Sequence, residues 1–376
     1  MTKLERLIAE LCPDGVEYKP LNQIATMARG VRVVKNQLAK DGKYPVFQNS
    51  MTPLGYYKES NYPANTTYII SAGAAGEIGY SIIAFWAADD CFCFTCPENL
   101  QSRFLYYALI CQQNYLFSRV RRASVPRLAR HIVEQLKIPL PPLPVQREII
   151  RILDNFTELT AELIAELTAR KKQYEYYRNI LFRFSDSAPI KLLGIIGKNL
   201  DSKRKPVTKG ARQSGIYPYY GASGIVDYVS DYIYDGDFLL VSEDGANLVA
   251  RNTPIAFTAS GKIWVNNHAH VIKFDTYEMR RYIEFYLNSI DLSRYISTAA
   301  QPKLSQENLN KIPIPMPPPD ERKRIVDILD RFDALTTDLT NGLPAEIAAR
   351  QKQYAYYRDK LLTFPALKGH LQEVGV

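Results

Sequence analysis

The sequence contains one stretch twice, and this repetition decides the fold. Residues 169–184 read ARKKQYEYYRNILFRF, and residues 349–364 read ARQKQYAYYRDKLLTF, with identical residues at 10 of 16 positions. Shorter matches precede these stretches, residues 152–154 with 328–330 and residues 137–139 with 311–313. Matches that recur in the same order do not arise from composition, so the chain is an internal repeat.

The repeated stretches are predicted to be long helices. From residue 145 to residue 187 the chain has no Gly or Pro, and apolar side chains recur three or four residues apart. Such spacing gives one apolar stripe, close to a coiled-coil seam. A helix over residues 146–184 would be roughly 58 Å long at about 1.5 Å per residue. It is too long to bury itself in a small globule, so we expect it to pair with its own repeat, residues 322–364. The predicted seam residues are Ile152, Phe156, Leu159, Tyr174 and Tyr177 on the first helix and Ile328, Phe332, Leu335, Tyr354 and Tyr357 on the second.

The second helix differs from the first by an insertion of four residues. Four residues make about one helical turn, roughly 6 Å, and therefore nearly preserve the phase of the seam. The inserted segment contains Gly342 and Pro344, which signal a kink or a break. A simple helix–turn–helix is the plainer alternative, and the sequence leaves both open.

The segments between the repeated stretches have diverged, and both are predicted to be rich in strands. Residues 65–96 and 216–274 alternate apolar runs with Gly-containing turns. A short helical stretch follows in each, at residues 102–116 and 279–290. The order is variable, shared, variable, shared. This order suggests one scaffold role for the similar parts and different targets for the divergent parts.

The composition is that of a globular protein with about two or three domains. The chain has 376 residues, of which 46% are hydrophobic and 23% are charged. Its net charge of +8 suits a polyanionic partner, but many other proteins are equally basic. Five cysteines, a charged start without an apolar signal segment, and no apolar run of about 18 residues predict a reduced cytoplasmic protein without a membrane span.

The sequence offers weak candidates for a metal site. Cys91, Cys93 and Cys96 lie close together, but the first two alternate with phenylalanines as in a strand, which favours small buried side chains over a zinc site. His268 and His270 also alternate along a predicted strand. Alternating histidines can bind metal, yet a half-exposed strand face is the plainer interpretation. We therefore predict no metal ligands.

A catalytic site is equally hard to find. Residues 13–19 contain a Pro-Asp and a Glu-x-Lys, as some nucleases do, but a turn this short leaves the carboxylates little room to converge on a metal. No Gly-x-Gly-x-x-Gly loop, no Gly-Lys-Ser/Thr phosphate loop and no adenine methyltransferase signature occurs in the sequence. We predict no catalytic residue and no cofactor on this chain.

Two basic runs, each ahead of a Tyr-Pro pair, are the best candidates for contacts with a nucleic acid. The predicted phosphate-contact residues are Arg29, Arg32, Lys35, Lys43, Arg121, Arg122, Arg127, Lys203, Arg204, Lys205, Lys209, Arg212 and Lys303. Polar residues at or after the Tyr-Pro pairs are candidates for base readout, with turn-forming residues as the alternative. They are Gln48, Asn49, Ser50, Tyr219, Tyr220 and Ser223.

These motifs together resemble the specificity subunits of type I restriction–modification systems. The resemblance covers nearly the whole chain. It is carried by residues 137–139 and 311–313 before the long helices, by residues 173–178 and 353–358 near their ends, and by residues 11–18. The duplication of the motifs at this spacing makes the resemblance specific.

The resemblance implies an α+β fold with two mixed, strand-rich target recognition domains. Two long antiparallel α-helices would separate them in a pseudo-two-fold internal repeat. The implied segments are an N-terminal helix (1–15), target recognition domain 1 (16–136), shared helical spacer 1 (137–187), target recognition domain 2 (188–310), and shared helical spacer 2 with a C-terminal tail (311–376).

The resemblance also implies a non-catalytic role. Each recognition domain would read one half of a split site in double-stranded DNA, and the long helices would dock two methyltransferase subunits. Those subunits would bind S-adenosylmethionine and methylate adenine, and an endonuclease or translocase subunit can join them. The alternatives are a two-domain structural adaptor of an assembly without DNA and a standalone enzyme. An adaptor would show no preference for duplex DNA at any salt concentration.

Overall fold

The chain forms two units, each of which mixes helices and strands. The computed structural model describes residues 1–184, 188–251, 253–297, 301–338 and 340–367. Residues 185–187 and 368–376, the ends of the two predicted spacer segments, lie outside the described residues. One unit consists of residues 1–163 with 347–376, and the other of residues 164–346. The predicted α+β class is confirmed. Within the described residues, none of the helices is long and apolar enough to span a membrane.

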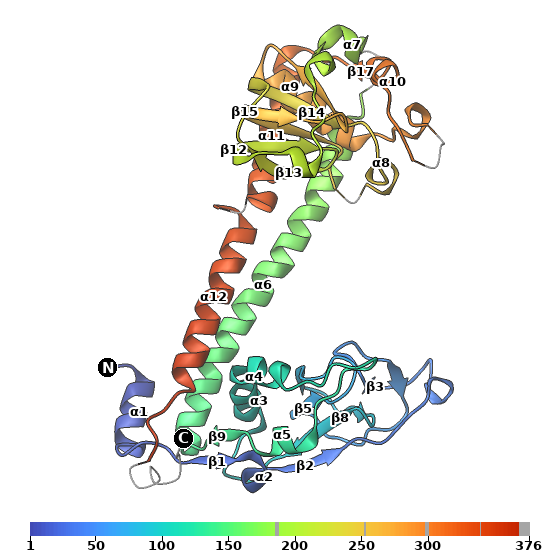
Figure 1. Cartoon of the computed structure of the whole chain (residues 1–376). Coiled ribbons are helices and arrows are strands. Elements are labelled where there is room, and N and C mark those ends of the chain that lie inside the picture. Colours follow the sequence, from blue (N-terminus) through green and yellow to red (C-terminus); the bar gives the residue numbers. More distant parts are fainter. Residues whose placement is uncertain (185–187, 252, 298–300, 339, 368–376) are drawn as a thin grey trace. The chain divides into compact units, whose positions relative to one another are not determined.

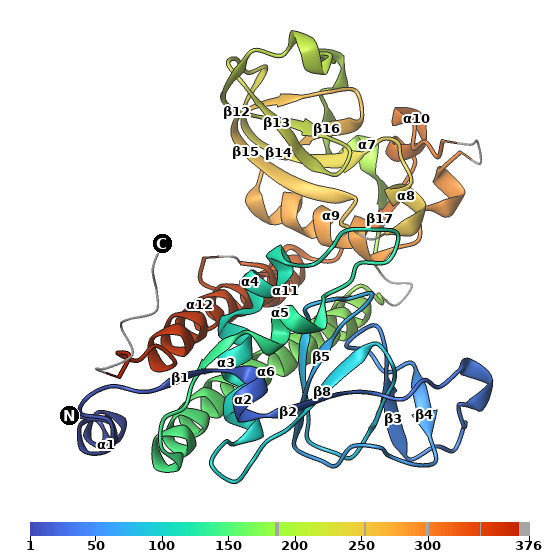
Figure 2. The same cartoon turned by 60° about the horizontal axis from the view of Figure 1, so that its bottom comes forward.

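The first unit packs helices against small sheets. Its helices are α1 (Lys3–Leu11), α2 (Leu21–Ile24), α3 (Ser102–Cys111), α4 (Gln113–Ser118), α5 (Arg130–Glu134), the start of α6 (Leu143–Leu181) and most of α12 (Leu343–Leu361), with a 3₁₀ turn η1 (Lys35–Gln37). Its strands are β1 (Tyr18–Pro20), β2 (Thr26–Arg29), β3 (Tyr44–Phe47), β4 (Gly55–Tyr57), β5 (Thr66–Ile70), β6 (Ile78–Ser81), β7 (Trp86–Ala87), β8 (Cys91–Thr95) and β9 (Lys137–Pro139). The sheet orders are β2-β8-β5-β6, β4-β3-β7 and β1-β9. In Figures 1 and 2 the β3–β4 hairpin and α1 lie at opposite ends of this unit.

Strand β8 shows how the sequence builds the core of the first unit. Its side chains point alternately to the two faces of the sheet. Cys91 and Cys93 pack with Tyr68 on one face, while Phe92 and Phe94 join the core under α3 on the other. Burial raises the pKa of the Cys91 thiol to about 12. The two cysteines are therefore buried hydrophobic residues in the protein, as the sequence indicated.

The second unit repeats this plan with longer strands. Its helices are the end of α6, α7 (Leu193–Ile196), α8 (Asn247–Ala250), α9 (Tyr277–Ser289), α10 (Gln306–Asn310) and α11 (Pro319–Thr337), with 3₁₀ turns η2 (Asp201–Lys203), η3 (Lys209–Ala211) and η4 (Ser293–Tyr295). Its strands are β10 (Ile190–Leu192), β11 (Lys198–Asn199), β12 (Ser214–Gly221), β13 (Gly224–Val229), β14 (Tyr234–Ser242), β15 (Ala256–Val265), β16 (Ala269–Lys273) and β17 (Pro313–Pro315). Figure 2 shows α9 between the large sheet and α11.

One strand explains why the sheets of the two units differ. In the second unit β15 pairs with β14 along its first part and with β12 along its last part, so a single sheet forms in the order β11-β16-β14-β15-β12-β13. In the first unit the corresponding segment is divided into β6 and β7. Ile82 and Ile83, which are exposed, lie in the interruption. The first unit therefore has two smaller sheets in place of one.

Similar contacts attach the strand-rich part of each unit to its long helix. Asp154 of α6 accepts hydrogen bonds from Arg103 and Tyr107 of α3. Asp330 of α11 accepts hydrogen bonds from Arg281 and Tyr277 of α9, each at 2.8 Å. Both aspartates belong to the repeated Ile-Leu-Asp motif. The motif is therefore duplicated in structure as well as in sequence.

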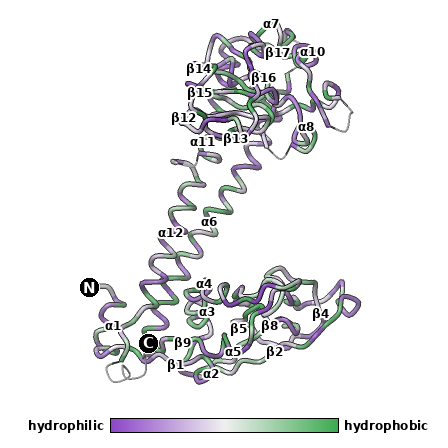
Figure 3. Tube along the Cα trace, in the orientation of Figure 1, coloured by the Kyte–Doolittle hydropathy of each residue, from purple (hydrophilic) through white to green (hydrophobic). Residues whose placement is uncertain are grey.

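The predicted long helix is present as α6, whose 39 residues are close to the predicted range. Figure 1 shows α6 and α12 side by side, and in Figure 3 the hydropathy along α6 changes repeatedly between polar and apolar. In the first unit Phe156 of α6 stacks on Tyr357 of α12, with 5.6 Å between ring centroids. In the second unit Tyr177 of α6 stacks on Phe332 of α11, also at 5.6 Å. The same pair of aromatic positions is used twice.

The other predicted seam residues differ in their surroundings. Tyr174 contacts the ring of Phe332, and Tyr354 packs against the core of the first unit. Leu159, in contrast, is 48% exposed. Ile152, Ile328 and Leu335 are half-buried, as are Phe156, Phe332, Tyr174 and Tyr354.

The second long helix is broken within residues 322–364, which decides between the alternatives that the sequence left open. Helix α11 ends at Thr337, and α12 begins at Leu343. A Cβ atom at Gly342 would approach the backbone of α11 to 2.6 Å, so only glycine fits at this position. The inserted segment therefore forms a tight turn between two helices.

Candidate nucleic-acid interface

Three segments of the first unit meet at one edge, which we call the first reading edge. It consists of residues 48–50 after β3, residues 71–74 after β5, and residues 121–127. The amide of Ala74 donates to the carbonyl of Asn49 at 2.9 Å, and the amide of Gly73 donates to the carbonyl of Pro126 at 3.1 Å. A Cβ atom at Gly73, whose φ is +83°, would lie 2.6 Å from the Asn49 carbonyl. The three segments are therefore held in close contact.

The second unit has an equivalent edge, which we call the second reading edge. It consists of residues 221–223 at the end of β12, residues 242–245 at the end of β14, and residues 302–304. Ser242 Oγ donates to the carbonyl of Ala222 at 2.5 Å, and the amide of Gly245 donates to the carbonyl of Pro302 at 3.1 Å. Gly245 also has a positive φ, +103°. Two segments that the sequence matched only weakly thus occupy the same place in each unit.

The first reading edge carries exposed arginines, and the acidic residues Asp89 and Asp90 lie beside it. Arg127 is exposed, and its backbone pairs with that of Arg121. Asp90 lies beside them, because its carbonyl accepts the amide of Ser71 at 2.6 Å. Burial raises the pKa of the Asp90 carboxyl, while Arg127 and Arg29 oppose this shift. The edge is therefore positively charged, with carboxylates beside it.

The second reading edge has a different balance of charge. The Lys303 ammonium lies 3.0 Å from the carboxylate of Glu243, and His268 Nδ1 lies 2.8 Å from Asp244. Arg204 also pairs with Glu243. Part of the positive charge of this edge is therefore neutralised within the protein itself.

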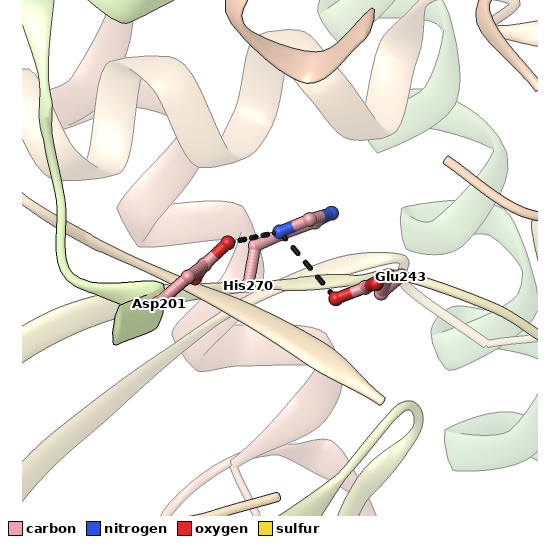
Figure 4. Close-up of side chains that lie close together, drawn as sticks. All are labelled: Asp201, Glu243 and His270. Atoms are coloured by element: carbon pink, nitrogen blue, oxygen red, sulfur yellow. Dashed lines mark hydrogen bonds and ion pairs between the residues drawn. The ribbon is translucent and has the colours of Figure 1, made fainter. Parts of the chain in front are cut away.

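A buried histidine lies directly behind the second reading edge. Figure 4 shows His270 between Asp201 and Glu243. His270 Nδ1 is 2.5 Å from Asp201 Oδ2 and 3.7 Å from Glu243 Oε2, and its Nε2 is 2.8 Å from the carbonyl of Leu304. Both ring nitrogens therefore lie within hydrogen-bond distance of an oxygen atom. The expectation of a half-exposed histidine strand is therefore wrong for His270, which is fully buried.

These three residues form the one group in the described part of the chain whose ligand atoms are close enough to hold a metal ion. However, Glu243 is already paired with Arg204 and Lys303. Burial alone would raise the pKa of the Asp201 carboxyl, but hydrogen bonding to His270 and its charge outweigh burial and lower it. An added cation would face Arg204 and Lys303, so we interpret the group as a buried ion-pair network.

Most predicted phosphate contacts are exposed in the structure. The exposed ones are Arg29, Arg32, Lys35, Lys43, Arg121, Arg122, Arg127, Lys203, Lys205, Lys209 and Lys303. Arg204 and Arg212 are half-buried. Arg204 pairs with Glu243, and Arg212 pairs with Asp227 at 3.1 Å. We therefore withdraw the assignment of Arg204 to phosphate contact, because its charge is used inside the domain.

Some of the predicted base-readout residues lie on the reading edges, and others are buried in the domain. Gln48, Asn49, Ser50 and Ser223 lie on the reading edges. Tyr219 does not reach them, because it is 1% exposed and its hydroxyl bonds to the backbone of Val207. We withdraw Tyr219 as a base reader for that reason. Tyr220 is half-buried, and its ring stacks on Phe257.

Sequence reasoning did not assign several residues to these edges, and it considered His268 only as a possible metal ligand. Asp90 and His268 occupy equivalent places, since the carbonyl of each accepts the amide that follows β5 or β14. A search for polar residues at the start of the Cys91–Thr95 strand and its counterpart would have found both. Asp244 was also missed, and it carried no motif in the sequence.

Two equivalent edges on a duplicated fold define a protein with two related binding domains, and comparisons with known proteins identify the family. The profile described as "Type I restriction modification DNA specificity domain" matches twice, at residues 13–170 and 186–349. A Haemophilus influenzae chain named "Putative type I restriction enzyme specificity subunit" is 31% identical over 96% of this chain and 98% of its own length. The Escherichia coli EcoR124I/EcoR124II specificity subunit is 37% identical over 72% of this chain and 73% of its own.

Solved structures agree on the fold. The S subunit of a type I restriction–modification system from M. genitalium superimposes with a TM-score of 0.64 at 18% identity, covering 93% of this chain and 96% of that one. A chain from a structure of type I system assembly gives a TM-score of 0.57 at 15% identity, covering 94% and 98%. The chain belongs to the family of type I restriction–modification DNA specificity subunits. It is a DNA sequence-recognition subunit with two recognition domains.

Proposed function

We propose that this chain reads a bipartite site in double-stranded DNA, with one half-site at each reading edge. The observation that carries the proposal is the duplication of the edge. In each unit a glycine amide donates to the carbonyl of the proline that precedes a basic residue, Arg127 in the first unit and Lys303 in the second, and a further hydrogen bond holds a polar turn beside them. Equivalent placement with divergent side chains is what two different half-sites require.

We further propose that Gln48 and Asn49 on the first edge, and Ser223 on the second, contact bases, while the exposed basic residues contact phosphates. Gln and Asn can bind adenine through two hydrogen bonds, and Ser can bond to several base edges. The basic residues would fix the register of the domain on the duplex without reading its sequence.

Chemistry is assigned to partner subunits in this proposal. Two methyltransferase subunits, which would bind S-adenosylmethionine, would dock on the helices α6, α11 and α12, and an endonuclease or translocase subunit could join. Tyr176 and Tyr356, at equivalent positions of the repeat, support the docking faces because they are 62% and 61% exposed. The complex would act on DNA in the cytoplasm.

Mapping methylated adenines across the source genome, with this gene intact and deleted, tests the proposal. We expect one split motif, two short half-sites around a fixed gap, to lose methylation in the deletion strain. An unchanged map, together with purified chain that shows no salt-dependent binding to duplex DNA, would favour the structural adaptor. Cutting or methylation of DNA by the purified chain alone would overturn the assignment of chemistry to partners.

A further inference from the structure

The two tryptophans of the chain occupy equivalent positions in the two units. Trp86 lies on β7 and Trp264 on β15. Each strand pairs in parallel with the strand that carries the Tyr-Pro pair, Trp86 opposite Val46 and Trp264 opposite Tyr219. The sequence contains no other tryptophan. A residue this rare, placed identically in two domains that have otherwise diverged, calls for a shared physical role.

Both indole groups make the same hydrogen bond. Trp86 Nε1 donates to the carbonyl of Val31 at 2.8 Å, and Trp264 Nε1 donates to the carbonyl of Lys205 at 2.7 Å. The amides of Val31 and Lys205 donate in turn to the residue after each tryptophan, at 2.8 and 3.3 Å. Val31 and Lys205, one residue in each of the two basic runs, are thus attached through both the amide and the carbonyl. Two points of attachment fix both the position and the orientation of the residue.

We call the pair of hydrogen bonds at Val31 and at Lys205 the clamp, and these two residues the clamped residues. The loops that contain them carry basic residues at the same sequence separations from the clamped residue. Two residues before the clamped residue stand Arg29 in the first unit and Lys203 in the second. Four residues after it stand Lys35 and Lys209, each the first residue of a 3₁₀ turn. The position directly after the clamped residue is not shared, since it is Arg32 in one loop and proline in the other. A charge kept at fixed places in loops of different sequence suits a partner that is the same for both, the phosphate backbone.

The rings also fasten the loops to the sheet. Trp86 meets Tyr57 edge-on, with 4.8 Å between ring centroids. Trp264 is nearly parallel to Tyr219 at 6.4 Å, and the Tyr219 hydroxyl holds the amide of Val207 in the same loop at 2.9 Å. Tyr219, which is too buried to read bases, therefore supports the basic loop through Trp264 and Val207.

The clamped loops lie next to the reading edges. In the first unit the Arg29 guanidinium approaches the carboxylate of Asp90 to 4.0 Å and donates to the carbonyl of Asp89. In the second unit Arg204, which directly precedes the clamped residue, pairs with Glu243 behind the edge. Each basic loop is therefore tied to the edge of its own unit.

We propose that Trp86 and Trp264 are positioning residues that hold a pair of phosphate contacts beside each half-site. Trp86 acts through Arg29 and Lys35, and Trp264 acts through Lys203 and Lys209. The inference rests on the proposed function, because it assigns the clamp to the same DNA interface. Neither tryptophan is a base reader in this proposal.

The test uses the full chain and the variants Trp86→Phe and Trp264→Phe, which keep an aromatic ring but lose the N–H donor. Binding is measured by fluorescence anisotropy between 0.05 and 0.3 M salt, on a labelled duplex that carries the split motif found by methylation mapping. Each phosphate contact contributes about 0.9 log units of affinity per decade of salt. We expect each variant to lower the slope by about 0.9 to 1.8 and to weaken binding at 0.1 M salt by roughly tenfold.

A double-variant cycle separates positioning from general damage. Lys35→Ala should cost roughly eightfold in the wild-type chain but little in the Trp86→Phe background, because the contact is already lost there. In the Trp264→Phe background Lys35→Ala should keep its full cost. Circular dichroism and thermal unfolding of each variant check that it is folded, and a merely destabilised variant would lower the bound fraction without changing the salt slope.

The outcomes are distinct. If the wild-type chain binds the duplex with a steep salt slope and both tryptophan variants keep that slope, the clamp proposal is overturned and the proposed function stands. If the wild-type chain shows no salt-dependent duplex binding, the proposed function itself is overturned. Full cost of Lys35→Ala in the Trp86→Phe background would also refute the clamp, even if the variant binds DNA more weakly.

Discussion

The two reading edges share one backbone frame but differ in what lies behind it. Where the first unit has Ser71 after β5, the second has Glu243, and where the first has Phe92 in the following strand, the second has His270. The first edge is backed by an apolar core, and the second by a buried network of charges. The comparison teaches that hydrogen bonds of the backbone preserve the position of an edge while its chemistry changes freely. It also makes the two edges matched controls for each other.

The largest difference should appear when the buried charges are disturbed. Glu243→Ala removes the buried carboxylate that pairs with Arg204 and Lys303 and leaves Asp201 as the remaining acidic partner of the network, so we expect the second unit to lose about 3 kcal/mol of stability. Ser71→Ala at the matching place removes one hydrogen bond to a carbonyl and should cost the first unit about 1 kcal/mol.

Urea unfolding followed by tryptophan fluorescence measures both effects separately. In a Trp86→Phe background the signal of Trp264 reports on the second unit, and in a Trp264→Phe background that of Trp86 reports on the first. Equal losses in the two units would show that the network contributes no special stability.

The helix seam should give the next largest effect. Phe156→Asp places a charge against Tyr357, and Phe332→Asp places one against Tyr177. Because buried charges are costly, we expect each to lower the stability of its own unit by about 2 kcal/mol. Co-purification with methyltransferase subunits should fall more than half-site preference does. Leu159→Asp, on an exposed part of the same helix, is the matched control, and a comparable loss there would contradict the seam.

Acid should weaken the second unit through its buried network. Hydrogen bonding and charge from His270, Arg204 and Lys303 outweigh burial and lower the pKa values of Asp201 and Glu243 below 3.8 and 4.5. Groups with lowered pKa values stabilise the fold above the unfolded values, and this stability is lost as the pH falls through the folded values. We expect a loss of about 1 kcal/mol or more below pH 4.5, which Glu243→Gln should reduce. Denaturation at pH 7, 5, 4 and 3.5 measures it, and an identical acid profile for that variant would rule out the network as the cause.

The smallest expected effect concerns the two equivalent basic residues. Arg127 is exposed at the first edge, whereas the ammonium of Lys303 at the second edge is already shared with Glu243. Arg127→Ala should therefore weaken duplex binding by roughly eightfold at 0.1 M salt, and Lys303→Ala by less. Salt titrations of both variants decide the order. A greater loss for Lys303→Ala would mean that its ion pair opens on DNA.

Local patterns in the sequence predicted the parts of the fold that depend on local interactions. The apolar period foretold α6, and the alternation around Cys91 foretold β8, because side-chain direction follows directly from helix and strand geometry. The break before α12 was left open, since Gly342 is compatible with either a kink or a turn. The structure has a turn, in which Gly342 lies so close to the backbone of α11 that there is no room for a side chain at this position.

The parts that could not be predicted depend on contacts between distant residues. His270 and Asp201 are 69 positions apart, and nothing in either segment signals their pairing. Arg204 looks like its exposed neighbours Lys203 and Lys205, and only the buried Glu243 distinguishes it. Tyr219 follows a Tyr-Pro turn that indicated exposure, yet packing against Trp264 buries it. The composition of a segment thus predicted that it lies at the surface, while tertiary packing decides which of its side chains are exposed.

The aspartate that each long helix presents to its recognition domain has a consequence for inheritance. Asp154 accepts hydrogen bonds from an arginine and a tyrosine of α3, and Asp330 accepts them from an arginine and a tyrosine of α9. Any other domain that supplies an arginine and a tyrosine at the same places can form the same hydrogen bonds to the aspartate of the long helix. The contacts that attach the domain are thus the same in both units, whereas the side chains of the two reading edges differ. Recombination between related genes at these boundaries can therefore produce a chain with a new target and an unaltered way of holding it.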